Sequence, residues 1–185
     1  MIEGENEFMT DVLFYQNYTY VADISAIVLC IICWLLLHSS YTVREKSLII
    51  FKAGTVCLMM ATVCSISFHT AITRITESRK ILIYVLQDGI YLLLILTFVL
   101  LCNYFGTLLK LEERPARLLG AVSWGGYAVF AFLEIGSPFT HLGFYIDADL
   151  MVHQNFYFDP FRFAYIYYCI CLLYTSPSPR DRTRS

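Results

Sequence analysis

Long apolar stretches separated by short polar segments account for most of this chain. A helix rises about 1.5 Å per residue, so about 20 apolar residues cross a hydrocarbon core roughly 30 Å thick. Residues 53–73 and 89–109 run that far without a formal charge. Residues 24–43 are similar, and residues 118–133 are shorter but continue into small and aromatic residues after Glu134. The pattern predicts an all-α fold of polytopic transmembrane helices, with four complete spans.

The segment that follows the fourth predicted span is rich in aromatic residues. Residues 143–146 (Gly-Phe-Tyr-Ile) and 156–158 (Phe-Tyr-Phe) have the composition of short strands, and polar residues between them are typical of a turn. Aromatic side chains settle readily among lipid headgroups. We therefore predict a small aromatic hairpin lying on the membrane, with an irregular interfacial loop as the alternative. The apolar run that begins at Phe161 predicts part of a fifth helix.

The C-terminal residues 171–185 have a different origin in our interpretation. Residues 171–181 read Cys-Leu-Leu-Tyr-Thr-Ser-Pro-Ser-Pro-Arg-Asp, which resembles, codon by codon, the translation of a transposon-end adapter from a sequencing library. The alternative is a solvated, disordered tail rich in Ser, Pro and Arg. We expect residues 1–170 to form one transmembrane domain that is truncated within its fifth helix, and residues 171–185 to be a non-native tail.

Charge is scarce in this chain. Charged residues make up 15% of the sequence and hydrophobic residues 58%, whereas an ordinary soluble domain has roughly 25% charged residues. Without residues 171–185, ten basic and fourteen acidic side chains remain. No run rich in lysine or arginine is present, so nucleic-acid binding is not expected. The acidic N-terminal segment lacks the basic residues of a cleavable signal peptide, and we expect the first helix to be an uncleaved anchor.

The distribution of lysine and arginine among the short connections predicts the orientation of the helices. The segment before the first span has no basic residue, and the second connection has three, whereas the first and third connections together have six. This excess predicts a multi-pass protein of the cell membrane, with an extracytoplasmic N-terminus and an extracytoplasmic hairpin. The basic residues are Arg44, Lys46 and Lys52 in the first connection, Arg74, Arg79 and Lys80 in the second, and Lys110, Arg114 and Arg117 in the third.

The cysteines and histidines form no recognisable catalytic or metal-binding pattern. Cys30 and Cys33 have CxxC spacing, but they fall inside the first span, where no histidine or carboxylate lies on the same turn. We interpret them, like the other cysteines of the spans, as small buried hydrophobic residues. The chain contains no phosphate-binding glycine loop and no HExxH sequence. We therefore expect no catalytic residue, no metal ion and no cofactor in this fragment.

Four ionisable residues lie near the helix ends that the predicted topology brings to the outer leaflet. Asp23 opens the first span, Asp88 lies within the N-terminal third of the third helix, Glu134 ends the fourth, and His141 follows it. A carboxylate at mid-bilayer would cost about 2.5 to 3.5 kcal/mol, so these groups are expected at the interface. One interpretation is a hydrated rim of polar residues. The other is that Asp23, Asp88, Glu134 and His141 line an outward-facing pocket that binds an extracytoplasmic small-molecule signal.

One short segment resembles a known family. Pro138-Phe-Thr-His and then Phe144-Tyr-Ile-Asp147, set between two apolar helices, are similar to the NPFTxxxFYfD segment of multi-helix sensor modules in Firmicutes. Gly136-Ser137 stands where that family has Asn, and Val152-His-Gln-Asn stands where a tyrosine and an Arg-Gly pair usually follow. The resemblance implies a bacterial membrane sensor and anchor for a cytoplasmic GGDEF or EAL domain, which makes or degrades cyclic di-GMP. It also implies that the catalytic domain is missing from this fragment.

Two other functions are compatible with the sequence. The same kind of module precedes sensor histidine kinases, and only downstream sequence would distinguish the two. A small transporter or channel would require helix-breaking residues and charges at mid-bilayer, whereas the central thirds of the four predicted spans are almost purely apolar and contain no proline. In each case the lipid bilayer is the expected partner, and a homodimer is one assembly that the sequence allows.

Overall fold

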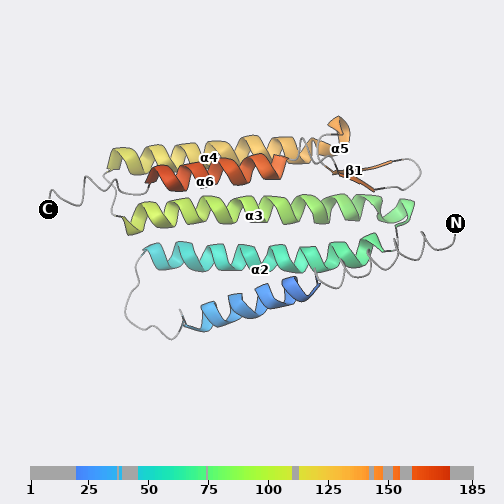
Figure 1. Cartoon of the computed structure of the whole chain (residues 1–185), viewed down its shortest axis with the longest axis horizontal. Coiled ribbons are helices and arrows are strands. Elements are labelled where there is room, and N and C mark those ends of the chain that lie inside the picture. The colour runs from blue at the N-terminus through green and yellow to red at the C-terminus, as the bar shows by residue number, and fades with distance from the viewer. Residues whose placement is uncertain are drawn as a thin grey trace, which may run out of the picture.

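The computed structural model is a bundle of long helices with a small β-hairpin at one end (Figure 1). In chain order its elements are the helix Tyr20–Leu36, α2 Lys46–Ile72, η1 Glu77–Arg79, α3 Lys80–Leu108, α4 Glu113–Ile135, α5 Ser137–Thr140, β1 Phe144–Ile146, β2 Val152–Gln154 and α6 Pro160–Thr175. The structure describes residues 20–36, 38, 46–73, 75–109, 113–141, 144–147, 152–154 and 160–175.

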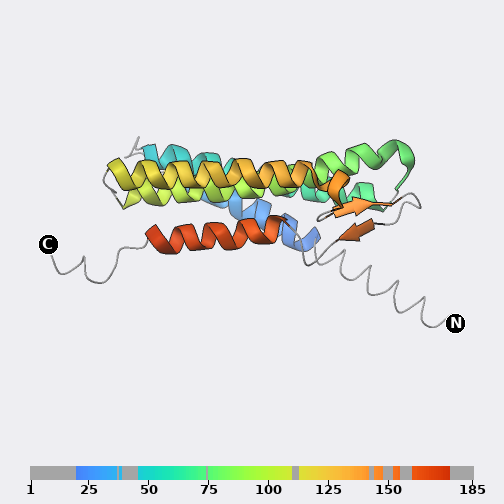
Figure 2. The same ribbon diagram turned by 90° about the horizontal axis from the view of Figure 1, so that it is seen from above.

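The long helices run alongside one another in two layers. In Figure 1, α3 lies between α2 and α4. In the view turned by 90°, the first helix and α6 both lie on the same side of these three helices (Figure 2), although Figure 1 shows them at opposite edges of the bundle, the first helix beside α2 and α6 beside α4. α3 contacts α2, α4 and α6, and α4 also contacts α6. The bundle is therefore organised around α3.

Three of the predicted spans are confirmed. Helical segments that are long and apolar enough to cross a membrane are Ser47–Ile72, Glu77–Leu108 and Arg114–Ile135. Two further apolar helical segments, Tyr20–Leu36 and Arg162–Leu173, are shorter than a full span. The first of these is about 25 Å long at 1.5 Å per residue, and residues 39–43 of the predicted first span lie outside the described residues. The predicted total of four complete spans and part of a fifth is therefore not confirmed.

The helices extend beyond the charge-free stretches on which the prediction was based. α2 begins at Lys46 and α3 at Lys80, because helical hydrogen bonding continues through polar residues at the edge of the apolar stretch. α3 has 29 residues, which corresponds to a length of about 43 Å. This length exceeds a hydrocarbon core of roughly 30 Å, so α3 projects beyond it or tilts within it.

Several threonine hydroxyl groups inside the spans are bonded within their own helices. Thr55 donates to the carbonyl oxygen of Phe51 at 3.0 Å, and Thr97 donates to that of Leu93 at 2.9 Å. Thr62 makes the same kind of bond three residues back, at 2.8 Å. A polar group without a partner in hydrocarbon is costly, and this local bonding removes that cost.

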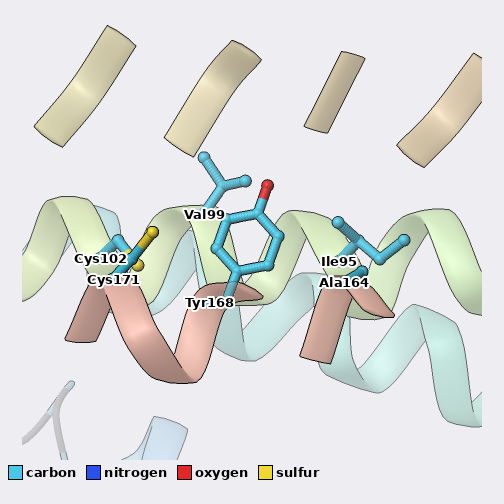
Figure 3. Packing of buried hydrophobic residues seen from close by; sticks show 6 residues of the cluster. All are labelled: Ile95, Val99, Cys102, Ala164, Tyr168 and Cys171. Carbon is cyan, nitrogen blue, oxygen red and sulfur yellow. The ribbon is translucent and has the colours of Figure 1, made fainter. Parts of the chain in front are cut away.

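A buried cluster joins α3 to α6. Tyr168 of α6 is fully buried, its ring stacks on that of Phe98 with centroids 6.1 Å apart, and its hydroxyl donates to the carbonyl oxygen of Ser123 in α4 at 2.8 Å. One side chain thus ties three helices together. The members of the cluster are Ile95, Val99 and Cys102 of α3 and Ala164, Tyr168 and Cys171 of α6 (Figure 3). Of these six residues, only Cys171 belongs to the segment that resembles an adapter.

The predicted aromatic hairpin is present, but its second strand lies elsewhere. β1 falls within the predicted first strand at residues 143–146 and pairs with β2 in an antiparallel register. β2 is Val152–Gln154, whereas the predicted strand at residues 156–158 lies outside the described residues. Ile146 pairs with Val152, so the loop holds only residues 147–151. A shorter loop loses less conformational entropy on closure, which favours the observed pairing.

Two adjacent glycines of α4 have different surroundings. A Cβ atom at Gly126 would lie 2.5 Å from Cε1 of Tyr167 in α6, whereas a Cβ atom at Gly125 would have nothing within 4 Å. Tyr167 is held in place, because its hydroxyl donates to the carbonyl oxygen of Val122 at 2.8 Å and its ring contacts that of Phe130. Gly126 therefore allows α6 to approach α4 closely, as small residues do between membrane helices.

We predict that Gly126→Val lowers the free energy of unfolding by about 1–3 kcal/mol, the usual cost of overpacking. Gly125→Val is the matched control and should change it by less than about 0.5 kcal/mol. Reversible unfolding in detergent micelles would measure both. Equal effects of the two substitutions would contradict the close contact between α4 and α6.

Candidate functional site

The segment that carries the family resemblance packs against the ends of α2 and α3. Phe144 of β1 lies between two aromatic rings, with its centroid 5.7 Å from that of Phe68 in α2 and 5.8 Å from that of Tyr84 in α3. Both pairs are edge-to-face, an arrangement that stabilises by about 0.5–1.5 kcal/mol beyond burial alone. Ile146 and Ile83 belong to the same buried cluster. β1 is therefore held by the helices and is not merely laid on a membrane surface.

Two hydrogen bonds also join this hairpin to α3. The backbone N–H of Ile146 donates to the hydroxyl oxygen of Tyr84 at 2.8 Å, in a partly buried position. Lys80 donates from Nζ to the carbonyl oxygen of Asp147 at 3.3 Å, in an exposed position. The first bond is shorter and better shielded from water, so it contributes more to holding the hairpin.

Ser137 connects the two halves of the family-like segment. Its side chain is buried, and its Oγ donates to the carbonyl oxygen of Phe144 at 3.2 Å. This bond spans the turn between α5, which carries Pro138-Phe-Thr, and β1, which carries Phe-Tyr-Ile. Serine is a short polar residue that can bond to nearby backbone as asparagine does. Ser137 therefore supplies a side-chain bond to the backbone of β1 at a position where the segment departs from the pattern that it resembles.

Asp23 faces α2 from the first helix. Ser65 donates from Oγ to Oδ2 of Asp23 at 2.8 Å. About one turn earlier, the Tyr20 ring lies edge-to-face on the ring of His69, with centroids 5.8 Å apart, and its hydroxyl lies 3.3 Å from Oγ1 of Thr70. These contacts attach the N-terminal part of the first helix to α2. The structure thus gives Asp23 a packing role that accounts for its position.

Asp88 of α3 and Glu134 of α4 lie at the same level of the bundle. A Cβ atom at Gly120 of α4 would lie 3.7 Å from Oδ1 of Asn103 in α3, which sets the register of these two antiparallel helices. Asp88 lies about four turns before Asn103, and Glu134 lies about four turns after Gly120. These similar offsets place both residues toward the hairpin end of their helices. Glu134 is only 1% exposed, and Asp88 is partly buried.

His141 lies on the surface of the hairpin end. It follows α5 with a φ of 54°, in the left-handed region that histidine tolerates better than most residues. Its ring is exposed and lies edge-to-face on Tyr145, with centroids 4.6 Å apart. Tyr145 alternates along β1 with the buried Phe144 and Ile146, so it points away from the helices. His141 and Tyr145 therefore form an aromatic face in which His141 is exposed and Tyr145 is partly exposed.

The four predicted binding residues thus have three different environments. The structure places Asp88 and Glu134 at a similar level of α3 and α4, and it gives Asp23 and His141 separate neighbours. Two apolar cavities, of about 320 Å³ and 540 Å³, lie beside the first helix, and none of the four residues lines either one. Among the residues that the structure describes, no three His, Cys, Asp or Glu side chains are grouped so that they could hold a metal ion.

Sequence reasoning missed the residue that links the hairpin to the bundle. Tyr84 lies four residues before Asp88, and residues at that spacing share one side of a helix. The position of Asp88 in the sequence could therefore have pointed to Tyr84 as a neighbour. Its bond to the backbone of Ile146 had no sequence signal, because it depends on how the hairpin docks. Asp88, Tyr84 and Phe144 together make this end of α3 the best candidate for a functional site.

No protein-family model, curated protein or solved structure matches this chain. The family resemblance therefore depends on the residues of the Pro138–Asp147 segment and on the order of the helices.

We predict that Tyr84→Phe increases amide hydrogen exchange in β1 about tenfold in lipid nanodiscs. The substitution leaves the Ile146 N–H without its acceptor, at a cost of about 1–3 kcal/mol for a buried donor. Lys80→Met is the comparison, because it removes the longer and more exposed bond and should change exchange by less than about threefold. Unchanged exchange in Tyr84→Phe would show that this bond does not hold the hairpin.

Proposed function

We propose that this chain is the membrane-embedded sensor and anchor module of a signal-transduction protein. The observation that carries the proposal is the attachment of the hairpin to the helices: Phe144 packs between Phe68 and Tyr84, and the Ile146 backbone bonds to Tyr84. A surface element joined in this way can pass a change of its own position to the helix that carries Tyr84. A hairpin that served only as a connection would need no such contacts.

A signal would act on this module by favouring one arrangement of the helices over another. A ligand shifts such an equilibrium only by the difference between its affinities for the two states. The face formed by His141 and Tyr145 is partly exposed and therefore available for binding, and Asp88 and Glu134 lie toward the same end of α3 and α4. Binding at the exposed face would move β1, and β1 would move the end of α3 near Asp88.

The output that we propose is the synthesis or hydrolysis of cyclic di-GMP by a GGDEF or EAL domain that follows residue 170 in the gene product. The support for this output is the resemblance of the Pro138–Asp147 segment to sensor modules of that family. In the same proposal the N-terminus and the hairpin are extracytoplasmic, on the basis of the lysine and arginine distribution. A histidine kinase in place of the cyclic di-GMP domain would leave the role of this module unchanged.

Sequencing the source gene with long reads tests the proposed output. We predict that the reading frame departs from this chain at about Cys169 or Ile170, completes a fifth helix and enters a GGDEF or EAL domain. A kinase domain at that position would replace the output and retain the sensor. A genomic sequence that encodes residues 171–185 and then stops would contradict the proposed signalling function.

We predict that Asp88→Asn changes the nucleotide turnover of that full-length protein by at least about threefold while membrane insertion stays normal. Removing a charge that contacts only one helix arrangement biases the equilibrium between the two. Glu77→Gln is the matched control, because Glu77 is an exposed carboxylate at the same end of the bundle. Equal and negligible effects of both substitutions on turnover, across pH values and candidate signals, would remove Asp88 from the sensing mechanism.

A further inference from the structure

An apolar furrow with a volume of about 540 Å³ lies between the first helix and α2. Its walls include Ile31, Trp34 and Leu35 from the first helix and Val56, Met60 and Val63 from α2. Leu35 is 60% exposed and Val63 is 56% exposed, so the two helices do not cover the furrow. Its size falls within the range of about 300–1,000 Å³ that small-molecule sites occupy.

The cation of Lys52 lies at one end of this furrow. The Nζ atom of Lys52 lies 5.8 Å from the centroid of the Trp34 ring. Within the described part of the chain, Lys52 has no carboxylate at ion-pairing distance. Lysine side chains on a helix point toward its N-terminus, so the Lys52 ammonium is directed toward the end at which α2 begins. Trp34 lies near the last residue of the first helix, where tryptophan is favoured at a membrane surface.

The order of groups along α2 matches the order of groups in a phospholipid. Lys52, Val56, Met60 and Val63 follow one another at intervals of about one turn, so they share one side of the helix. The cation therefore lies at the level of the lipid headgroups, and the apolar wall runs from there toward the centre of the bilayer. A phospholipid has its charge and its acyl chains in the same order.

We propose that this furrow binds one acyl chain of an anionic phospholipid whose headgroup phosphate contacts Lys52. The lipid comes from the leaflet at the end where α2 begins. The thioether of Met60 adapts its shape to a flexible chain, and the Trp34 ring lies beside both the Lys52 ammonium and the acyl chain. The polar contacts of Asp23 and Tyr20 with α2 lie at the opposite end of the first helix. The lipid thus packs between the two helices at the end away from these contacts.

Trp34 provides a direct probe of this site. The chain has two tryptophans, and Trp124→Phe leaves Trp34 as the only one. The full chain is reconstituted in phosphatidylcholine vesicles that contain phosphatidylglycerol, with brominated chains on one lipid or the other. Quenching of Trp34 by each brominated lipid gives the relative affinity of the site for that lipid. We expect an affinity for phosphatidylglycerol about fivefold higher than for phosphatidylcholine, which is the effect of one basic side chain near an anionic headgroup. Trp124, isolated by Trp34→Phe, lies on α4 and should show a preference of about one.

Lys52→Gln should lower the preference at Trp34 to about one, and Lys52→Arg should retain it. Arg114→Gln is the matched control, because it removes an exposed basic residue at the same end of the bundle without touching the furrow. Should Lys52→Gln fail to insert, the salt dependence of the Lys52 protein gives the same test, since added salt must weaken a headgroup contact. Equal preferences at Trp34 and Trp124, or a preference that survives Lys52→Gln or ignores salt, would overturn the proposal. The proposal requires only that these helices lie in a membrane and is independent of the signalling output.

Discussion

Helices in lipid gain little from hydrophobic association, because the acyl chains around them are as apolar as their own side chains. Close packing and hydrogen bonds between helices must hold such a bundle together, and in this chain both centre on α3. α3 packs with Tyr168 of α6, whose hydroxyl also bonds to α4. It also packs along α2, and its first turns support β1. The remaining elements thus depend on α3 for their relative positions.

The same side of α3 serves the core and the candidate site. Tyr84, Asp88, Ile95 and Val99 lie on one side of the helix by their spacing. Tyr84 bonds to the hairpin, and Ile95 and Val99 are buried against α6. A displacement of the hairpin would therefore act on the helix that also carries the core contacts. This continuity is the physical basis for treating the hairpin and the bundle as one responsive unit.

The spans could be predicted from sequence, because the requirement for about 20 apolar residues leaves a strong local signal. The first strand of the hairpin was also predictable. The second predicted strand, at residues 156–158, lies outside the described residues, and the strand that pairs with β1 is Val152–Gln154, a choice that the shorter loop favours. The candidate site was predicted only in part. Asp88 and Glu134 share a level because of helix register, and register is set by contacts such as that of Gly120 with Asn103. Tyr84 and Lys52 act through partners that are distant in sequence, so their roles needed the structure.

A double-mutant cycle on Phe68 and Phe144 tests most directly whether the hairpin and the helices form one unit. The free energy of unfolding would be measured in mixed micelles for Phe68→Ala, for Phe144→Ala and for the double variant. The edge-to-face contact between the two rings predicts a coupling energy of about 0.5–1.5 kcal/mol. Purely additive effects of the two substitutions would mean that the hairpin is not docked on α2, and they would contradict this account.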